Sequence, residues 1–119
     1  MKITHIITDL DTGGAEIMLC KLLASLHDDK ALNSTVISLM GRGKITEQIE
    51  ALGVKVETLD LGQGERPSWQ TIKKLRQCMR TFNPDIVQGW MYHGNIAATV
   101  AVFLFDPMRR KVKLFWNVR

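Results

Sequence analysis

The sequence predicts an α/β fold, a Rossmann-like parallel β-sheet of about five strands with helices on both faces. Short runs rich in Val, Ile and Thr alternate with longer amphipathic segments along the chain. Strands separated by helix-length segments pair in parallel through right-handed crossovers, which cover both faces of the sheet. A glycine pair, Gly13 and Gly14, also stands between the first strand and the first helix. The 119 residues are expected to form one domain, 1–119, because this length supports a single core.

Hydrophobic periodicity and turn residues place nine elements in order. The expected elements are strand 2–8, helix 15–26, strand 33–40, helix 46–52, strand 54–59, helix 68–82, strand 85–90, helix 94–105 and strand 112–118.

Local signals justify each of these elements in turn. The strand 2–8 is a short apolar run, and the helix 15–26 repeats its apolar residues with the helical period. After the β-branched strand 33–40, Thr46 is expected to cap the next helix, and Gly53 to end it before the third strand.

The second half of the chain follows the same logic. Ser68 is expected to cap a helix whose apolar residues all face the core. These residues are Trp69, Ile72, Leu75, Met79 and Phe82. Asn83 and Pro84 then end the helix, because proline cannot continue it. Strand 85–90, a helix of small residues and a last strand complete the pattern.

Composition limits the class of protein. The chain is 45% hydrophobic and 24% charged, and it has no apolar run of the roughly 20 residues that span a bilayer. Its N-terminus lacks the pattern of a signal peptide, so a cytoplasmic location is expected. Cys20 and Cys78 have neither C-x-x-C spacing nor neighbouring His ligands. We therefore expect two small apolar side chains, with no metal site and no disulfide framework.

Charge is divided unevenly along the chain. Residues 1–60 carry 6 basic and 9 acidic side chains, whereas residues 61–119 carry 10 basic and 3 acidic ones. The basic residues form two clusters, Lys73, Lys74, Arg76 and Arg80, and Arg109, Arg110, Lys111 and Lys113. Each cluster suits anionic lipid headgroups or a phosphate-bearing ligand, and each is also compatible with a solvated surface. Nucleic acid is not expected, because aromatic residues are not interleaved with the basic ones.

Candidate site residues lie where the strands end. In open parallel sheets, ligands bind beyond the carboxyl ends of the strands, near the point where the strand order reverses. His93 follows the fourth strand and can exchange hydrogen bonds with a sugar hydroxyl or a phosphate at neutral pH, or it can cap the next helix. Trp90 and Tyr92 offer ring faces on which sugars stack, although aromatic residues at strand ends are also ordinary core residues. Asn95 can bind a ligand or cap the same helix.

Other residues near these ends are given structural roles. His5 lies inside the first strand and His27 at the end of the first helix, so both are expected to be structural. The segment 41–44 is not a P-loop, because Ser38 and Ile45 stand where that motif requires a glycine and a Ser or Thr.

Three segments together resemble the N-terminal domain of family 4 glycosyltransferases. They are ITDLDTGGAE (7–16), FNPDIVQGWMYHGN (82–95) and FWNVR (115–119), and they occur in the order found in that family. The resemblance covers essentially the whole chain. It implies a GT-B architecture, in which two Rossmann-like domains face each other across a cleft. The N-terminal domain mainly holds the acceptor, and the C-terminal domain holds the nucleotide-sugar.

The resemblance also implies roles for individual residues. It assigns Gly13, Gly14 and Glu16 to the loop near the donor diphosphate, His93 to the catalytic region, and Trp90, Tyr92, Asn95 and Arg119 to the acceptor side. Some relatives carry a Val-His-x-His pattern where this chain has Gln88 and Trp90, so a general base is not assigned. The family uses a nucleotide-sugar as co-substrate, requires no metal or other cofactor, and transfers the sugar with retention of configuration. Stabilisation of the departing diphosphate would then be the main catalytic contribution.

The expected function is therefore transfer of a sugar to a glycan or lipid-linked acceptor, as in polysaccharide biosynthesis. Basic clusters favour peripheral contact with the inner face of the cell membrane. The C-terminal domain, with its Glu-x7-Glu segment, lies outside these residues, so the domain alone is expected to be inactive.

Two alternatives remain from other classes. One is a non-catalytic ligand-binding module of the same fold. The other is a receiver-like phosphoacceptor domain, in which Asp9, Asp11 and Asp60 would surround Mg²⁺. A nicotinamide-binding domain is disfavoured, because the glycine pair does not extend to G-x-G-x-x-G.

Overall fold

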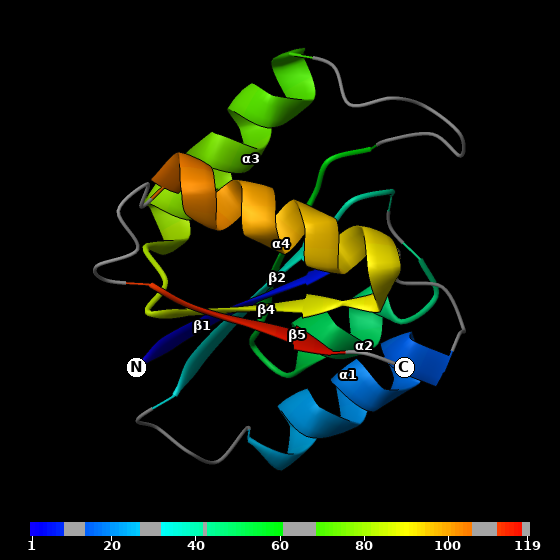
Figure 1. Cartoon of the computed structure of the whole chain (residues 1–119). Helices are drawn as coiled ribbons and strands as arrows, with labels where there is room; N and C mark the ends of the chain where they lie inside the picture. The colour runs from blue at the N-terminus through cyan, green and yellow to red at the C-terminus, as the bar shows by residue number, and fades with distance from the viewer. Residues whose placement is uncertain (9–13, 27–31, 42, 61–68, 106–111, 118–119) are drawn as a thin grey trace.

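A computed structural model describes residues 1–8, 14–26, 32–41, 43–60, 69–105 and 112–117, and within these residues the chain forms five strands and four helices (Figure 1). The elements are β1 (Lys2–Ile7), α1 (Gly14–Ser25), β2 (Asn33–Ser38), α2 (Thr46–Ala51), β3 (Lys55–Thr58), α3 (Trp69–Phe82), β4 (Ile86–Trp90), α4 (Met91–Phe105) and β5 (Lys113–Asn117). The strands form one parallel sheet in the order β3-β2-β1-β4-β5. The predicted Rossmann-like α/β fold is confirmed.

The molecule has three layers, with α1 and α2 on one face of the sheet and α3 and α4 on the other (Figure 1). The chain moves outward from β1 through β2 to β3, and then returns past β1 to β4 and β5. Crossovers between parallel strands are right-handed as a rule, so this reversal of direction moves the helices to the opposite face.

Alternate side chains of the strands build a separate core under each helical layer. Ile6 points toward α3 and α4, where it joins Val87 and Met79 in one buried cluster. Its neighbour Ile7 points toward α1 and α2, where it packs with Leu19 and other buried side chains. Burial on both faces is typical of a central strand in a parallel sheet, and in β1 it includes the polar residues Thr4 and His5.

The most important shift in an element boundary concerns α4. This helix begins at Met91, directly after β4, whereas the sequence predicts a start at Gly94. Glycine has weak helix preference and often marks a boundary, so the pattern placed the helix start three residues too late. The residues expected in a loop after β4 therefore belong to the first turns of a helix.

The expected cap of α2 is also wrong, whereas Gly53 follows the end of the helix as predicted. Ile45 is the N-cap residue and makes no side-chain cap, while the Thr46 hydroxyl accepts the backbone N–H of Gly43 at 2.8 Å. Thr46 thus ties the preceding turn to the helix. Gly53 follows the helix with φ +82°, and its N–H donates to the Glu50 carbonyl. This is the left-handed conformation that glycine adopts most easily.

The orientation of Trp69 is a second correction. It is the first residue of α3 and is 72% exposed, although the sequence predicts that it is buried. The face of α3 that packs on the sheet carries Leu75 and Met79. Trp69 stands six residues before Leu75, which places it about 120° around the helix from that face. The helix ends at Phe82, before Asn83 and Pro84, as predicted.

No helix within the described ranges is both long enough and apolar enough to cross a membrane.

Candidate functional site

The strand order reverses between β1 and β4, at the carboxyl edge of the sheet. β1 pairs with β2 on one side and with β4 on the other, and Ile7 is in register with both Ser38 and Trp90. From this edge the chain continues into α1 on one face and into α4 on the other. Open α/β sheets bind ligands at such a reversal point.

The start of α1 provides one side of this edge. Gly14 is its first residue, and Glu16 lies buried in its first turn. A carboxylate at this position interacts favourably with the positive end of the helix dipole. Because Glu16 is buried, its placement suits holding the start of the helix better than meeting a ligand from solvent. Gly13 lies outside the described residues.

The start of α4 provides the other side. Tyr92, His93 and Asn95 lie in its first two turns, immediately after Trp90. The first backbone N–H groups of a helix have no partners within the helix, so they can donate to a ligand at the sheet edge. The side chains of these three residues, like all of Arg119, lie outside the described part of the structure.

Trp90 occupies the core, where it is hydrogen-bonded to His5. Its indole N–H donates to His5 Nδ1 at 3.1 Å, and the two ring centroids are 6.0 Å apart. Only 4% of Trp90 is exposed. The sequence suggested that Trp90 offers a ring face to a sugar, but the structure places this ring beneath α1, against Ile7 and Leu19.

His5 is the buried partner of this pair, with 1% of its surface exposed. Burial lowers the pKa of His5 from 6.5 to about 4, so the ring is neutral at physiological pH. Because Nδ1 accepts the indole proton, the proton of the neutral ring lies on Nε2. Nε2 is buried and has no hydrogen-bond partner among the described residues. The structural role expected for His5 is consistent with this position.

Sequence reasoning did not find the His5–Trp90 pair. A signal was present, because Trp90 is in register with Ile7, and His5 stands two residues earlier on the same face of β1. That signal becomes readable only when β1 and β4 are known to be neighbours.

The ends of β2 and β3 are held by backbone hydrogen bonds that extend beyond the strands. The N–H groups of Leu39 and Met40 donate to Ile7 and Thr8 at 2.9 and 3.0 Å, and that of Asp60 donates to Met40 at 3.2 Å. The Asp60 carboxylate accepts the Thr58 hydroxyl at 3.2 Å and lies 3.7 Å from Lys74 Nζ. Asp60 is thus engaged with its own neighbours.

The strand order argues against a receiver-like phosphoacceptor site. Receiver-like sheets have the order 2-1-3-4-5, which brings the ends of the first and third strands together. In this chain β2 separates β1 from β3, so Asp60 does not lie beside the end of β1. Asp9 and Asp11 are outside the described residues, and the described ones include no group of three or more metal-ligating side chains.

A shallow pocket of about 180 Å³ lies away from this edge, between β3 and α3. Its lining includes Glu57, Lys74 and Cys78. Burial raises the pKa of the Cys78 thiol, and the nearby charge of Glu57 raises it further. Cys78 is buried and Cys20 half-buried, as the sequence predicts, and both are free thiols. This pocket shares no residue with the site predicted from the sequence.

Neither a protein-family model nor a curated protein matches this chain.

Proposed function

We propose that this chain is the acceptor-side N-terminal domain of a retaining glycosyltransferase of GT-B architecture. It would act with a nucleotide-sugar domain to transfer a sugar to a glycan or lipid-linked acceptor. One observation carries most of the proposal. β1 and β4 are adjacent and parallel, with Ile7 in register with Trp90, so the two longest family-like segments leave the sheet at the same edge.

This arrangement suits the chemistry of sugar transfer. A departing nucleoside diphosphate is a strong anion, and helix starts bind anions through free backbone N–H groups and the helix dipole. The starts of α1 and α4 both belong to the proposed site. Donors that are already oriented toward the developing charge stabilise the transition state without reorganisation.

The proposed roles keep the assignments implied by the resemblance, except for those of Glu16 and Trp90, which are both buried. Gly13 and Gly14 allow close approach of the diphosphate, and Glu16 holds the start of α1. His93 contacts the reacting sugar, and Tyr92, Asn95 and Arg119 border the acceptor. Trp90 does not meet the acceptor, because its ring is buried beneath α1, on the face of the sheet opposite α4.

A transfer assay on the native gene product that contains residues 1–119 tests this proposal. A panel of nucleotide-sugars is supplied with membrane-extracted glycolipids, and His93→Ala is compared with His27→Ala, a histidine outside the proposed site. We expect His93→Ala to lower kcat about 100-fold or more, as expected for a lost transition-state hydrogen bond, and His27→Ala to have little effect. Thermal melts of both variants check that the fold is retained.

Two results would contradict the proposal in different ways. Equal turnover of His93→Ala and wild type would remove His93 from the site. A gene product without a second Rossmann-like domain, and without transfer from any donor, would exclude the enzyme. Retained binding of nucleotide-sugars in that case would favour the non-catalytic module instead.

A further inference from the structure

α3 presents a row of cations to solvent. Lys73, Arg76 and Arg80 are exposed and separated by three and four residues, so they lie on one face of the helix with Trp69 at its start. The opposite face of α3 is buried against the sheet. Lys74 does not belong to this row, because its ammonium lies 3.7 Å from the Asp60 carboxylate. The outward face of α3 is therefore basic, with an exposed indole at one end.

α4 presents a row of apolar side chains beside it. Ile96, Val100 and Phe103 are 47%, 40% and 64% exposed and follow the same helical spacing. Ala98 and Val102 lie on the other face and are buried. This exposed row points away from the sheet. A further helix packed on the sheet next to α4 would therefore not cover it.

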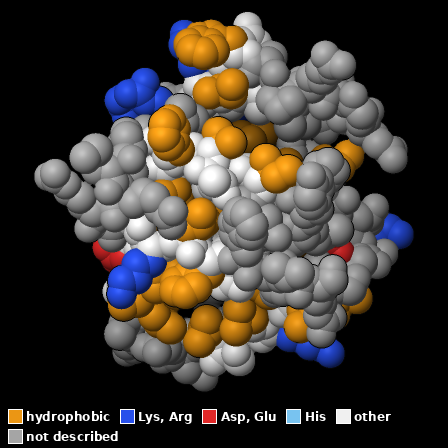
Figure 2. All heavy atoms as spheres, viewed as in Figure 1, with side chains coloured by type: hydrophobic (Ala, Val, Ile, Leu, Met, Phe, Trp, Pro, Cys, Tyr) orange, Lys and Arg blue, Asp and Glu red, His pale blue; other side chains and the backbone are white. Residues whose placement is uncertain are grey.

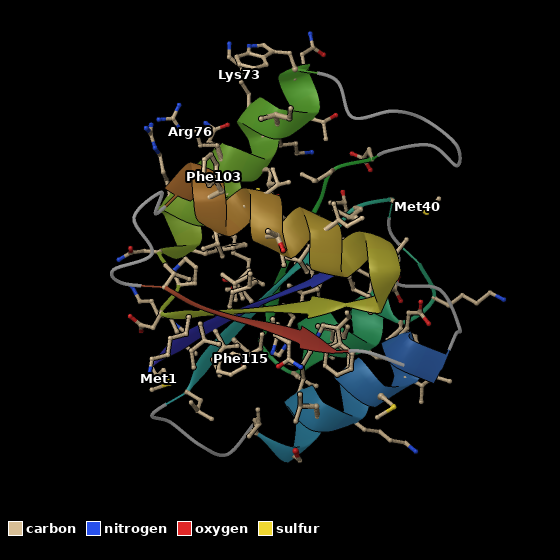
Figure 3. The ribbon with its side chains drawn as sticks, viewed as in Figure 1. Met1, Met40, Lys73, Arg76, Phe103 and Phe115 are labelled. Atoms are coloured by element: carbon tan, nitrogen blue, oxygen red, sulfur yellow. The ribbon has the colours of Figure 1, made fainter. Side chains whose placement is uncertain are left out.

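The two rows belong to one surface. α3 and α4 are in contact along the same face of the sheet (Figure 1). Lys73, Arg76 and Phe103 project from the same side of the molecule (Figure 3). Hydrophobic and basic side chains lie next to one another there, as Figure 2 shows. We call this the α3–α4 surface; it comprises Trp69, Lys73, Arg76, Arg80, Ile96, Val100 and Phe103.

Charge complementarity identifies the partner as an anion. Neither α3 nor α4 contains an acidic residue, and α4 contains no charged residue at all. A second copy of the chain would thus bring no acidic side chain on these helices to pair with the cations. The surface combines cations with an adjacent row of exposed apolar groups, including a tryptophan and a phenylalanine. This is the combination that binds the interface of an anionic bilayer.

We propose that the α3–α4 surface docks the domain on an anionic lipid bilayer. The three cations contact headgroup phosphates, while Phe103, Val100 and Ile96 enter the boundary between headgroups and acyl chains. Binding is peripheral, because only the outer side chains of the two helices enter the lipid. It requires neither sugar transfer nor a nucleotide, so its test is independent of the proposed function.

Vesicle co-sedimentation of the 119-residue chain tests the electrostatic part. Phosphatidylcholine vesicles with and without phosphatidylglycerol are compared at about 0.1 M and about 1 M salt, between which the screening length falls from about 10 Å to about 3 Å. We expect binding to the anionic vesicles, and loss of most of it in high salt or without phosphatidylglycerol.

Matched triple variants locate the binding surface. Each cation near an anionic membrane contributes about fivefold in affinity, so Lys73→Gln with Arg76→Gln and Arg80→Gln should lose about 100-fold. The control changes the net charge equally at exposed lysines outside α3 and α4, with Lys21→Gln, Lys44→Gln and Lys55→Gln. The control should bind within a few-fold of wild type. Equal losses in the two triple variants would overturn the proposal.

The apolar row has its own test. Phe103→Ser with Ile96→Ser should weaken vesicle binding about tenfold or more, because it removes apolar area that enters the lipid. Circular dichroism confirms the fold, which both exposed positions should leave intact. Undiminished vesicle binding by this variant would overturn the proposal. The proposal would also be overturned if light scattering showed a wild-type dimer that this variant disrupts, and if neither protein bound vesicles. The surface would then join two copies of the chain.

Discussion

Acid should destabilise this fold through His5. The ring is 1% exposed, and its Nδ1 accepts the Trp90 indole N–H at 3.1 Å. Protonation would place a second N–H on the nitrogen that faces this donor, so the hydrogen bond would break. It would also bury a positive charge, and among the described residues no acidic group is shown to balance it. The folded state therefore resists a proton that the unfolded chain accepts readily.

The size of the effect follows from the shift in pKa. Burial lowers the pKa of His5 from 6.5 to about 4. Between these values the unfolded chain binds more protons than the folded one, so the free energy of unfolding falls as pH falls. Each unit of pKa difference corresponds to 1.36 kcal/mol, which gives a total loss of about 3 kcal/mol. The loss begins near pH 6.5 and is complete near the lowered pKa; at higher pH His5 contributes no pH dependence.

Urea unfolding, followed by circular dichroism from about pH 4 to about pH 8, measures this dependence. His5→Asn is the comparison, because its amide oxygen can take the place of Nδ1 as acceptor and does not titrate. Carboxylates and the other histidines titrate in both proteins, so the difference between the two curves isolates His5. A flat difference between pH 6.5 and 4 would refute the reasoning. His5→Gln provides a second comparison if His5→Asn unfolds too readily.

Three further predictions concern packing, backbone conformation and thiol reactivity. Met79→Ala should lower the free energy of unfolding by about 2–5 kcal/mol, because Met79 is fully buried between α3 and the sheet. Ile17→Ala, at an exposed position, should cost far less. Similar urea midpoints for the two variants would contradict this prediction. Gly53→Ala should cost about 1 kcal/mol in the same assay, because Gly53 has φ +82°. No neighbouring atom lies within 4 Å of the added Cβ, so only backbone strain contributes. A gain in stability would show that the turn relaxes. Cys78 should react with a thiol reagent at neutral pH more slowly than Cys20, because burial raises the pKa of the Cys78 thiol. Mass spectrometry of the labelled peptides measures both rates. Equal rates would show that the buried face of α3 opens.

Much of the fold was predictable because its signals are local. Periodicity placed every described strand and helix, and most ends differ by one or two residues from the prediction. The start of α4 was missed because a strand passes directly into a helix there, and no turn residue marks the boundary. The reversal in strand order is a long-range property. Local patterns predict parallel strands, but they do not state that β1 lies between β2 and β4.

The two corrected tryptophans show what hydrophobicity alone leaves open. Residue type and spacing favour a buried Trp69 and a ligand-facing Trp90, whereas Trp69 is exposed and Trp90 is buried. Trp69 lies on the outward face of α3, about 120° from the buried row. Trp90 lies at a strand end, where exposure is common, but α1 covers its face of the sheet and His5 satisfies its N–H. The burial of a large side chain is thus decided by the neighbouring elements.

The candidate site was predictable only as a set of segments. Parallel strands bring all carboxyl ends to one edge, so residues 9–14 and 88–95 could be grouped from the sequence. Their closer relation depends on the pairing of Ile7 with Trp90, which comes from the assembled sheet. The roles of His93 and Asn95 remain predictions, because their side chains lie outside the described part of the structure.

α4 connects the two proposals made for this protein. Its first turns carry Tyr92, His93 and Asn95, and the exposed apolar row begins at the next residue, Ile96. If the α3–α4 surface rests on a bilayer, the start of α4 lies within about 20 Å of the lipid, because the whole helix is only 15 residues long. An acceptor anchored in that bilayer would reach the proposed site without leaving the membrane, whereas a soluble acceptor would gain nothing from the docking. If both proposals hold, a lipid-linked acceptor would therefore fit this domain better than a soluble glycan.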